Sequence, residues 1–219
     1  MSLITRLAAC AAAVPLLVAT AGTATAGTSW TYKSSGVTAS TSWLEVGPIP
    51  GVAGNAHVGY LSAQGDRVVD VFGEVYDWTC PDGVLPPDGG GHGEEPETEC
   101  ALENVRFVYA QPGAVTLTVD KKLAKARLTG VLDVSDHDGG SAGRPPVDIT
   151  WTGIGSSSTE RSYSTFTENG TRYRSRYTAT TREGDVEGRI GAMVFDDEAG
   201  ETSYGAFGTY RTDERAMTR

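Results

Sequence analysis

The feature that most constrains the fold of this chain is an alternation of apolar and polar side chains that recurs along most of its length. In the segment AVTLTVD, Val115, Leu117 and Val119 alternate with threonines, and the segment VDITWTG repeats the pattern. Successive side chains of a β-strand point to opposite faces, so a period of two indicates half-buried strands. No stretch after residue 26 shows the period of an amphipathic helix, and we therefore expect an all-β fold.

The links between the expected strands are mostly short, and short links favour antiparallel neighbours. We expect a single antiparallel all-β domain of about ten strands, folded as a β-barrel or a β-sandwich, and the sequence leaves both architectures open. The expected strands lie near 37–46, 56–63, 67–79, 103–110, 114–120, 125–134, 146–153, 159–168, 171–182, 185–195 and 202–211. Trp78 and Trp151 are expected in the core, and Trp30 and Trp43 are expected to be packed rather than free to stack on sugar rings.

The first 26 residues have the three parts of a secretory signal peptide. Arg6 supplies the positive charge, LAACAAAVPLLVAT the apolar run, and AGTATA a small-residue cleavage site that ends at Ala26. The apolar run is too short to cross a bilayer, which takes about 20 residues. We therefore expect a secreted, extracellular protein whose mature domain spans 27–219, with no transmembrane segment after cleavage.

The chain is acidic, with a formal net charge of −10. An acidic surface repels nucleic acid, so no nucleic-acid partner is expected. The three histidines, His57, His92 and His137, are scattered and form no ligand set with regular spacing. We accordingly expect no metal and no cofactor.

Two cysteines remain after the signal peptide, Cys80 and Cys100, and they close a segment rich in Pro, Gly and Glu. Zinc sites usually draw cysteines from closely spaced pairs, and neither cysteine has a second one nearby. Two cysteines in an oxidising compartment most simply pair with each other. The sequence therefore predicts a Cys80–Cys100 disulfide that staples the loop at 80–100.

The segment STFTENGTRYRSRY predicts a β-hairpin, because Asn169-Gly170 favours a two-residue type I′ turn. In that register three arginines of the second strand share one face with Tyr163, Thr165 and Thr167 of the first strand, and Arg161 joins them. Such a row could bind a carboxylated, sulfated or phosphorylated polymer, while pairing with carboxylates from Glu187 on a neighbouring strand would leave it a solvated surface. The candidate ligand-binding residues are Arg161, Tyr163, Arg172, Arg174 and Arg176.

Other motifs raise the alternative of a secreted hydrolase. The tip FDDEAGE groups Asp196, Asp197, Glu198 and Glu201, and the 80–100 loop carries His92, Glu94, Glu95, Glu97 and Glu99. Gly139–Gly143 matches G-x-S-x-G, but a nucleophile elbow needs a following helix, and Pro145 and Pro146 prevent one. Catalytic residues are therefore unknown, and a hairpin tip and a solvated loop are the simpler interpretations. An inhibitor that projects the 80–100 loop is a further alternative.

The segments CPDGVLPP, PPVDITWTG and GRIGAMVFDDEAGE, together with the Ala/Thr-rich export signal, resemble those of uncharacterised secreted β-rich proteins of high-GC Gram-positive bacteria. This resemblance implies a bacterial, exported β-domain and brings no activity and no catalytic residues. We therefore expect a non-catalytic β-domain whose arginine-rich hairpin face binds an anionic polysaccharide or cell-envelope component. The hydrolase with loop carboxylates remains the alternative.

Overall fold

The structure, a computed structural model, describes residues 29–87, 99–195 and 204–218. Every regular element in these ranges is a strand, and all strand pairs are antiparallel, which confirms the predicted fold class. The strands are β1 (Trp30–Val46), β2 (Ala56–Gly65), β3 (Val69–Thr79), β4 (Ala101–Tyr109), β5 (Val115–Val119), β6 (Lys125–Val131), β7 (Asp133–Asp136), β8 (Ser141–Gly143), β9 (Pro146–Gly153), β10 (Ser158–Glu168), β11 (Thr171–Ile190), β12 (Met193–Phe195) and β13 (Tyr204–Thr218).

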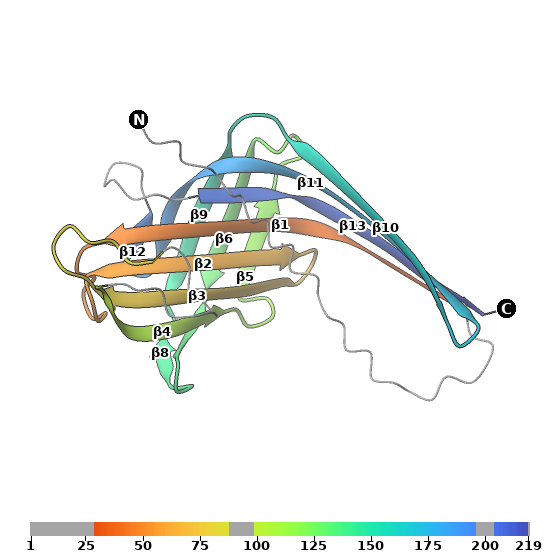
Figure 1. Cartoon of the computed structure of the whole chain (residues 1–219). Helices are drawn as coiled ribbons and strands as arrows, with labels where there is room; N and C mark the ends of the chain where they lie inside the picture. Colours follow the sequence, from red (N-terminus) through yellow and green to blue (C-terminus); the bar gives the residue numbers. More distant parts are fainter. Residues whose placement is uncertain (1–28, 88–98, 196–203, 219) are drawn as a thin grey trace.

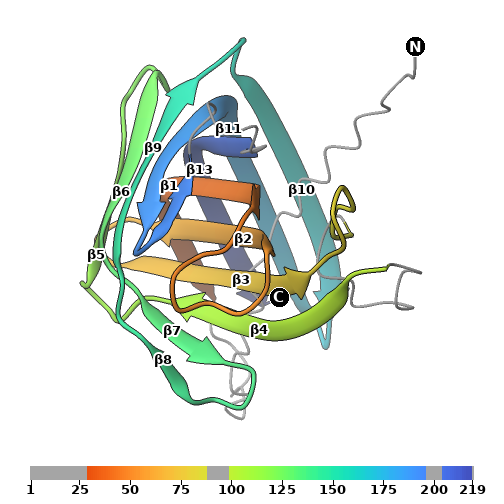
Figure 2. The same ribbon diagram turned by 90° about the vertical axis from the view of Figure 1, so that its left-hand side faces the viewer.

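The strands form one sheet that curls into a half-barrel (Figures 1 and 2). Its order is β5-β6-β9-β11-β13-β1-β2-β3-β4-β7-β8, and β10 and β12 pair with β11 outside this path. Only Leu132 separates β6 from β7, although the two strands stand near opposite ends of the order. The chain therefore joins both ends of the sheet at Leu132, and β5 comes to contact β1, β2 and β3 across the interior.

The concave face of the half-barrel holds the hydrophobic core. Trp151 and Phe207 are its largest fully buried side chains, and Trp151 Nε1 donates a hydrogen bond to the Ser40 carbonyl at 2.9 Å. Gly59 lies against the Trp43 ring, and a Cβ at this position would overlap the indole. Large aromatic side chains thus fill the interior because small residues on neighbouring strands, such as Gly59 opposite Trp43, leave room for them.

The expected positions of the tryptophans are confirmed with one exception. Trp78 and Trp151 are 9% and 0% exposed, and Trp43 is 3% exposed. Trp30 is 46% exposed, so the expectation that it packs is wrong. Trp30 lies at the end of β1 that projects beyond the half-barrel, where no described element covers it.

A buried polar network joins three neighbouring strands inside the half-barrel. His57 Nδ1 lies 2.8 Å from Asp77 Oδ1, and both side chains are fully buried. Arg106 donates from Nε to Asp77 Oδ2 at 2.8 Å and from Nη2 to Oδ1 at 2.6 Å. Arg106 balances the buried charge of Asp77, and the network links β2, β3 and β4.

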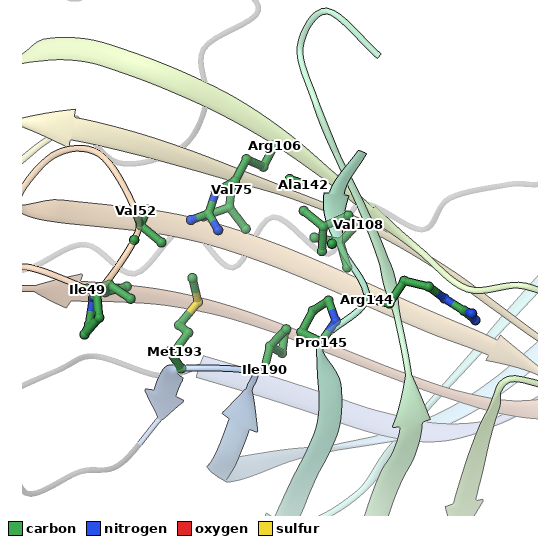
Figure 3. A pocket seen from close by; sticks show the side chains of 16 residues that line it. Ile49, Val52, Val75, Arg106, Val108, Ala142, Arg144, Pro145, Ile190 and Met193 are labelled. Carbon is green, nitrogen blue, oxygen red and sulfur yellow. The ribbon is translucent and has the colours of Figure 1, made fainter. Parts of the chain in front are cut away.

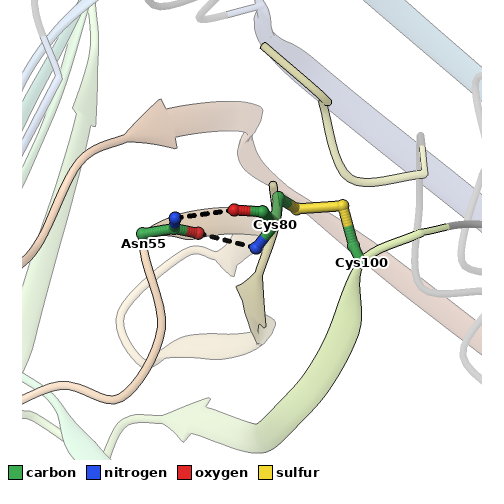
Figure 4. The surroundings of a disulfide bond; sticks show 3 residues. All are labelled: Asn55, Cys80 and Cys100. Atoms are coloured by element: carbon green, nitrogen blue, oxygen red, sulfur yellow. Dashed lines mark hydrogen bonds between the residues drawn. A yellow bond between two sulfur atoms is a disulfide. The ribbon is translucent and has the colours of Figure 1, made fainter. Parts of the chain in front are cut away.

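The predicted disulfide between Cys80 and Cys100 is present (Figure 4). It joins the end of β3 to the start of β4, next to the pair formed by Thr79 and Ala101. Asn55 extends this edge, since its amide donates to the Cys80 carbonyl at 2.9 Å and its Oδ1 accepts from the Cys80 N–H at 2.8 Å. The disulfide therefore holds a strand pair at its open end as well as closing the 80–100 loop.

The hairpin around Asn169-Gly170 forms in the predicted register. Both turn residues have positive φ, 46° and 75°, as a type I′ turn requires. Glu168 pairs with Thr171, and Phe166 pairs with Tyr173. The strand that follows is longer than expected, since β11 continues without a break from Thr171 to Ile190.

Strands β1, β11 and β13 continue beyond the rim of the half-barrel. Together with β10 they form a projecting four-stranded sheet in the order β10-β11-β13-β1 (Figure 1). We call this sheet the wing and define it as residues 30–36, 158–168, 171–182 and 209–218. Every residue of β10 is exposed, so no second layer covers this strand in the described structure. The wing takes its register from strands that are anchored in the core.

Candidate functional site

The candidate binding residues gather on one face of the wing. Arg172, Arg174 and Arg176 alternate along β11. Tyr163 is the direct partner of Arg176, and Arg161 lies two residues before Tyr163 on β10. Directly opposed residues in an antiparallel pair point to the same face. All five side chains therefore share the face that continues the concave side of the half-barrel.

Three further cations lie on this face, and the sequence analysis did not identify them as candidate binding residues. Arg215 is the direct partner of Arg174, and Lys33 is the direct partner of Asp213 on the next strand. Arg211 follows on β13 with the same alternation, so the pattern of RTDER was the available signal. We call the set of seven cations the basic face; its members are Lys33, Arg161, Arg172, Arg174, Arg176, Arg211 and Arg215.

The basic face forms a regular lattice of positive charge. Alternate residues on one strand are about 6.6 Å apart, and neighbouring strands are about 4.8 Å apart. Four strands and four rows of side chains therefore give a footprint of roughly 20 by 15 Å. The sheet geometry fixes this spacing, so a ligand meets a preformed array.

Asp213 is the one carboxylate that the register places on the basic face. Arg215 donates to it from Nε at 2.9 Å and from Nη2 at 3.1 Å, and Lys33 Nζ lies 4.0 Å away. The hydrogen bonds from Arg215 hold the pKa of Asp213 below its ordinary value, and the charges of Lys33 and Arg211 lower it further. Asp213 thus orients Arg215, and the basic face keeps a strong excess of positive charge.

Four arginines of the basic face, Arg161, Arg172, Arg174 and Arg176, have no counter-ion among the described residues. Arg161, Arg172 and Arg176 make no ion pair or hydrogen bond with a described residue. Arg174 Nε is buried and has no hydrogen-bond partner among the described residues. The guanidinium groups of Arg161, Arg172 and Arg176 therefore keep donors available for an anionic ligand.

Tyr163 adds a polar ring to the same face. Its side chain is 65% exposed, and its Oη accepts a hydrogen bond from the Thr165 hydroxyl at 2.8 Å. This hydrogen bond lowers the pKa of Tyr163, and the charges of Arg174 and Arg172 lower it further. The strand register places Tyr163 opposite Arg176 and beside Arg174 on this face.

The carboxylate of Glu187 does not lie beside Arg172, Arg174 and Arg176, where a neighbouring strand was expected to bring it. Glu187 and Arg189 belong to β11 itself, at the end that pairs with β9 inside the half-barrel. The strand adjacent to the arginine row is β13, which brings Arg211, Asp213 and Arg215. The neighbouring strand therefore adds more positive charge than it removes.

The hydrolase alternative depends largely on side chains outside the described residues, including His92 and Asp196. The G-x-S-x-G segment lies in the hairpin of β7 and β8, which has no helix after the serine. A cavity of about 410 Å³ opens at the end of the half-barrel where the β1–β2 loop and β12 lie (Figure 3). It is lined largely by aliphatic residues and by Arg106 and Arg144, and the lining contains no carboxylate, histidine, serine or cysteine. The cavity therefore gives the hydrolase no support.

No cluster of three or more His, Cys, Asp or Glu side chains among the described residues could hold a metal ion. No helix in the described parts of the chain has the length and apolar character to cross a membrane.

The sequence matches no protein-family model, and neither the curated proteins nor the solved structures contain a match.

Proposed function

We propose that this protein is a secreted, non-catalytic β-domain that binds an anionic polymer of the cell envelope through the basic face. The observation that carries the proposal is the concentration of seven cations around one carboxylate, in a chain whose net charge is −10. Like charges on neighbouring strands destabilise a sheet. A basic cluster in an acidic protein is therefore costly unless an anion occupies it.

The chemistry of the face suits a repeating polyanion. A guanidinium forms two parallel hydrogen bonds to a carboxylate, sulfate or phosphate. The hydroxyls of Tyr163 and of the threonines between the arginines can accept and donate hydrogen bonds to sugar oxygens. Charged acidic polysaccharides fit this combination, and the excess negative charge on the rest of the chain disfavours deep wrapping by nucleic acid.

The experiment is a binding titration of the expected mature form, residues 27–219, with defined polymers. Polygalacturonate, dextran sulfate and polyphosphate test three anionic groups, and neutral dextran is the negative control. Each titration is run at low and at high salt, because salt screens exposed charges within roughly 10 Å at 0.1 M. We expect salt-sensitive binding to the anionic polymers and none to neutral dextran.

The test variant carries Arg172→Ala, Arg174→Ala and Arg176→Ala. A matched control carries Arg67→Ala, Arg127→Ala and Arg189→Ala, which removes the same charge from exposed positions away from the basic face. We expect loss of binding in the first variant and near-normal binding in the second. Equal loss in both would show that net charge alone drives binding, and the proposed site would then be wrong.

A further inference from the structure

The opposite face of the wing is aromatic. Trp30, Tyr32 and Phe166 are 46%, 45% and 56% exposed. The rings of Phe166 and Tyr173 stack with centroids 4.8 Å apart and planes 13° from parallel. We call the six rings that the register places here the aromatic face; its members are Trp30, Tyr32, Phe166, Tyr173, Tyr177 and Tyr210.

The two faces of the wing also differ in charge. The register places Glu160, Glu168 and Glu214 on the aromatic face and places no described Lys or Arg there. Burial raises the pKa of Tyr177, and the charge of Glu160 raises it further. Glu160 pairs with Ala179, two residues along β11 from Tyr177, so a carboxylate lies beside the rings. One face of the sheet is therefore cationic, and the other is aromatic and anionic.

An aromatic sheet face without a covering layer is unusual in a soluble domain. A sheet normally buries its apolar face against another layer, and two packed sheets lie about 10 Å apart. No described element covers the aromatic face beside β10, since every residue of that strand is exposed. The exposed rings therefore mark a surface that fits a partner.

We propose that the partner is a second copy of this chain, whose basic face packs against the aromatic face. Charge complementarity identifies the occupant, because guanidinium groups stack favourably on aromatic rings and pair with carboxylates. Glu214 lies at the centre of the aromatic face, between Ser175 and Tyr32. In the stacked arrangement Glu214 meets arginines of the other copy.

The reverse arrangement, in which two aromatic faces meet, is electrostatically unfavourable. It would bring the three glutamates of one copy against those of the other with no cation between them. Burying Glu214 without a partner would add a desolvation cost. Basic-to-aromatic packing avoids both costs. It is also heterologous, so each added copy leaves one face of each kind open and the assembly grows.

The test is sedimentation velocity over a range of protein concentrations with three samples. The wild type should form a series of oligomers that salt dissociates. The basic-face variant, Arg172→Ala with Arg174→Ala and Arg176→Ala, should be monomeric by itself. The aromatic-face variant, Trp30→Ala with Tyr32→Ala and Phe166→Ala, should also be monomeric. Loss of three exposed cation–π contacts should weaken association roughly tenfold or more.

The decisive sample is an equimolar mixture of the two variants. Each retains the face that the other lacks, so the mixture should form a 1:1 dimer that does not grow. Dimers of the basic-face variant alone would show that aromatic faces pair with each other. Association of the aromatic-face variant alone would show that another surface meets the arginines. A monomeric wild type would overturn the proposal as well.

Two measurements keep this inference separate from polymer binding. Circular dichroism and thermal unfolding establish that both variants are folded. The aromatic-face variant should bind polyanions like the wild type, because its basic face is intact. A polyanion should also dissociate wild-type oligomers, because both ligands require the same arginines. Failure of the oligomer series with normal polymer binding would reject the stacking alone.

Discussion

Arg174 on β11 and Arg215 on β13 are directly opposed in the antiparallel ladder, so two guanidinium side chains occupy adjacent positions on one face. Arg215 has Asp213 as its counter-ion, whereas Arg174 Nε is buried without a hydrogen-bond partner among the described residues. An opposed pair of like charges destabilises a sheet, and an unsatisfied buried donor adds to this cost. The position is thus unfavourable for folding and favourable for binding an anion.

The first prediction is that Arg174→Met stabilises the protein and weakens its binding to polyanions. The substitution keeps an unbranched side chain and removes the charge and the unsatisfied donor. We expect the free energy of unfolding to rise by about 1 kcal/mol, at the low end of the cost of such a donor. Urea unfolding measures the stability, and titration with dextran sulfate measures the binding. A variant that is destabilised and binds normally would contradict the assignment.

The second prediction concerns Asp213, the one carboxylate on the basic face. Asp213→Asn should strengthen polyanion binding roughly two- to fivefold, as expected for one exposed charge. It should also steepen the salt dependence. Asp66→Asn, which removes a carboxylate from the exposed turn between β2 and β3, serves as the charge-matched control. Equal effects of both substitutions would show that the position of the charge does not matter.

The pH dependence of binding to a sulfated polymer follows from the same carboxylate. Arg215 holds the pKa of Asp213 below its ordinary value. A lowered pKa in the folded state means that the stabilising pair is present above the unfolded pKa of about 3.9 and is lost as the pH falls through the folded value. Protonation of Asp213 removes the negative charge from the basic face, so binding by the wild type should strengthen as the pH falls through the lowered pKa of Asp213. The Asp213→Asn variant has no carboxylate to protonate and should show no such increase.

Local patterns predicted the strands and the hairpin because the responsible interactions lie close together in the chain. The alternation at Val115–Val119 predicted β5, and Asn169-Gly170 predicted both the turn and the register. The length of β1 could not be predicted in this way. Within residues 30–36 the alternation of aromatic and polar side chains is limited to Trp30–Lys33, and the strand depends on pairing with β13 at the far end of the sequence.

The basic face could be predicted only in part, because some of its residues come together through pairing between strands that are far apart in the sequence. Arg172, Arg174 and Arg176 alternate on one strand, and the turn fixes their relation to Tyr163. Arg215 joins them because β13 inserts between β11 and β1, which is a property of the whole sheet. Strand order in a sheet with long-range pairing is set by core packing, which a linear pattern does not contain.

The third prediction concerns the titration of Tyr163. A hydrogen bond from the Thr165 hydroxyl lowers the pKa of this phenol, and Arg174 and Arg172 lower it further. Thr165→Val should therefore raise the pKa of Tyr163. The absorbance change of tyrosinate, taken as the difference from a Tyr163→Phe variant, isolates this group from Tyr76, whose pKa is raised to about 12 by burial and by Glu74. An unchanged titration would show that the hydrogen bond is absent in solution.

The fourth prediction concerns the disulfide. Replacing Cys80 and Cys100 by serine should lower the free energy of unfolding by about 3 kcal/mol, the value expected for closing a loop of this order. The Asn55 hydrogen bonds to the Cys80 backbone should keep the end of β3 in place, so the variant should fold. Urea unfolding with and without reductant tests this, because reductant should destabilise the wild type and leave the variant unchanged.

The fifth prediction separates the buried network from the binding face. Asp77 is fully buried and accepts hydrogen bonds from both His57 and Arg106. Asp77→Asn leaves the Arg106 charge without its counter-ion in the interior, and breaking a buried pair in this way costs about 3–5 kcal/mol. Urea unfolding should show this loss.

Polyanion affinity, measured below the unfolding transition of the Asp77→Asn variant, should stay close to that of the wild type. The wing lies beyond the rim of the half-barrel (Figure 1), and the described hydrogen bonds of this network join His57, Asp77 and Arg106 to one another. A loss of affinity in the folded variant would mean that the interior controls the geometry of the wing. Unchanged affinity with lowered stability would show that the core sets the register of the strands and that the exposed arginines alone bind the polymer.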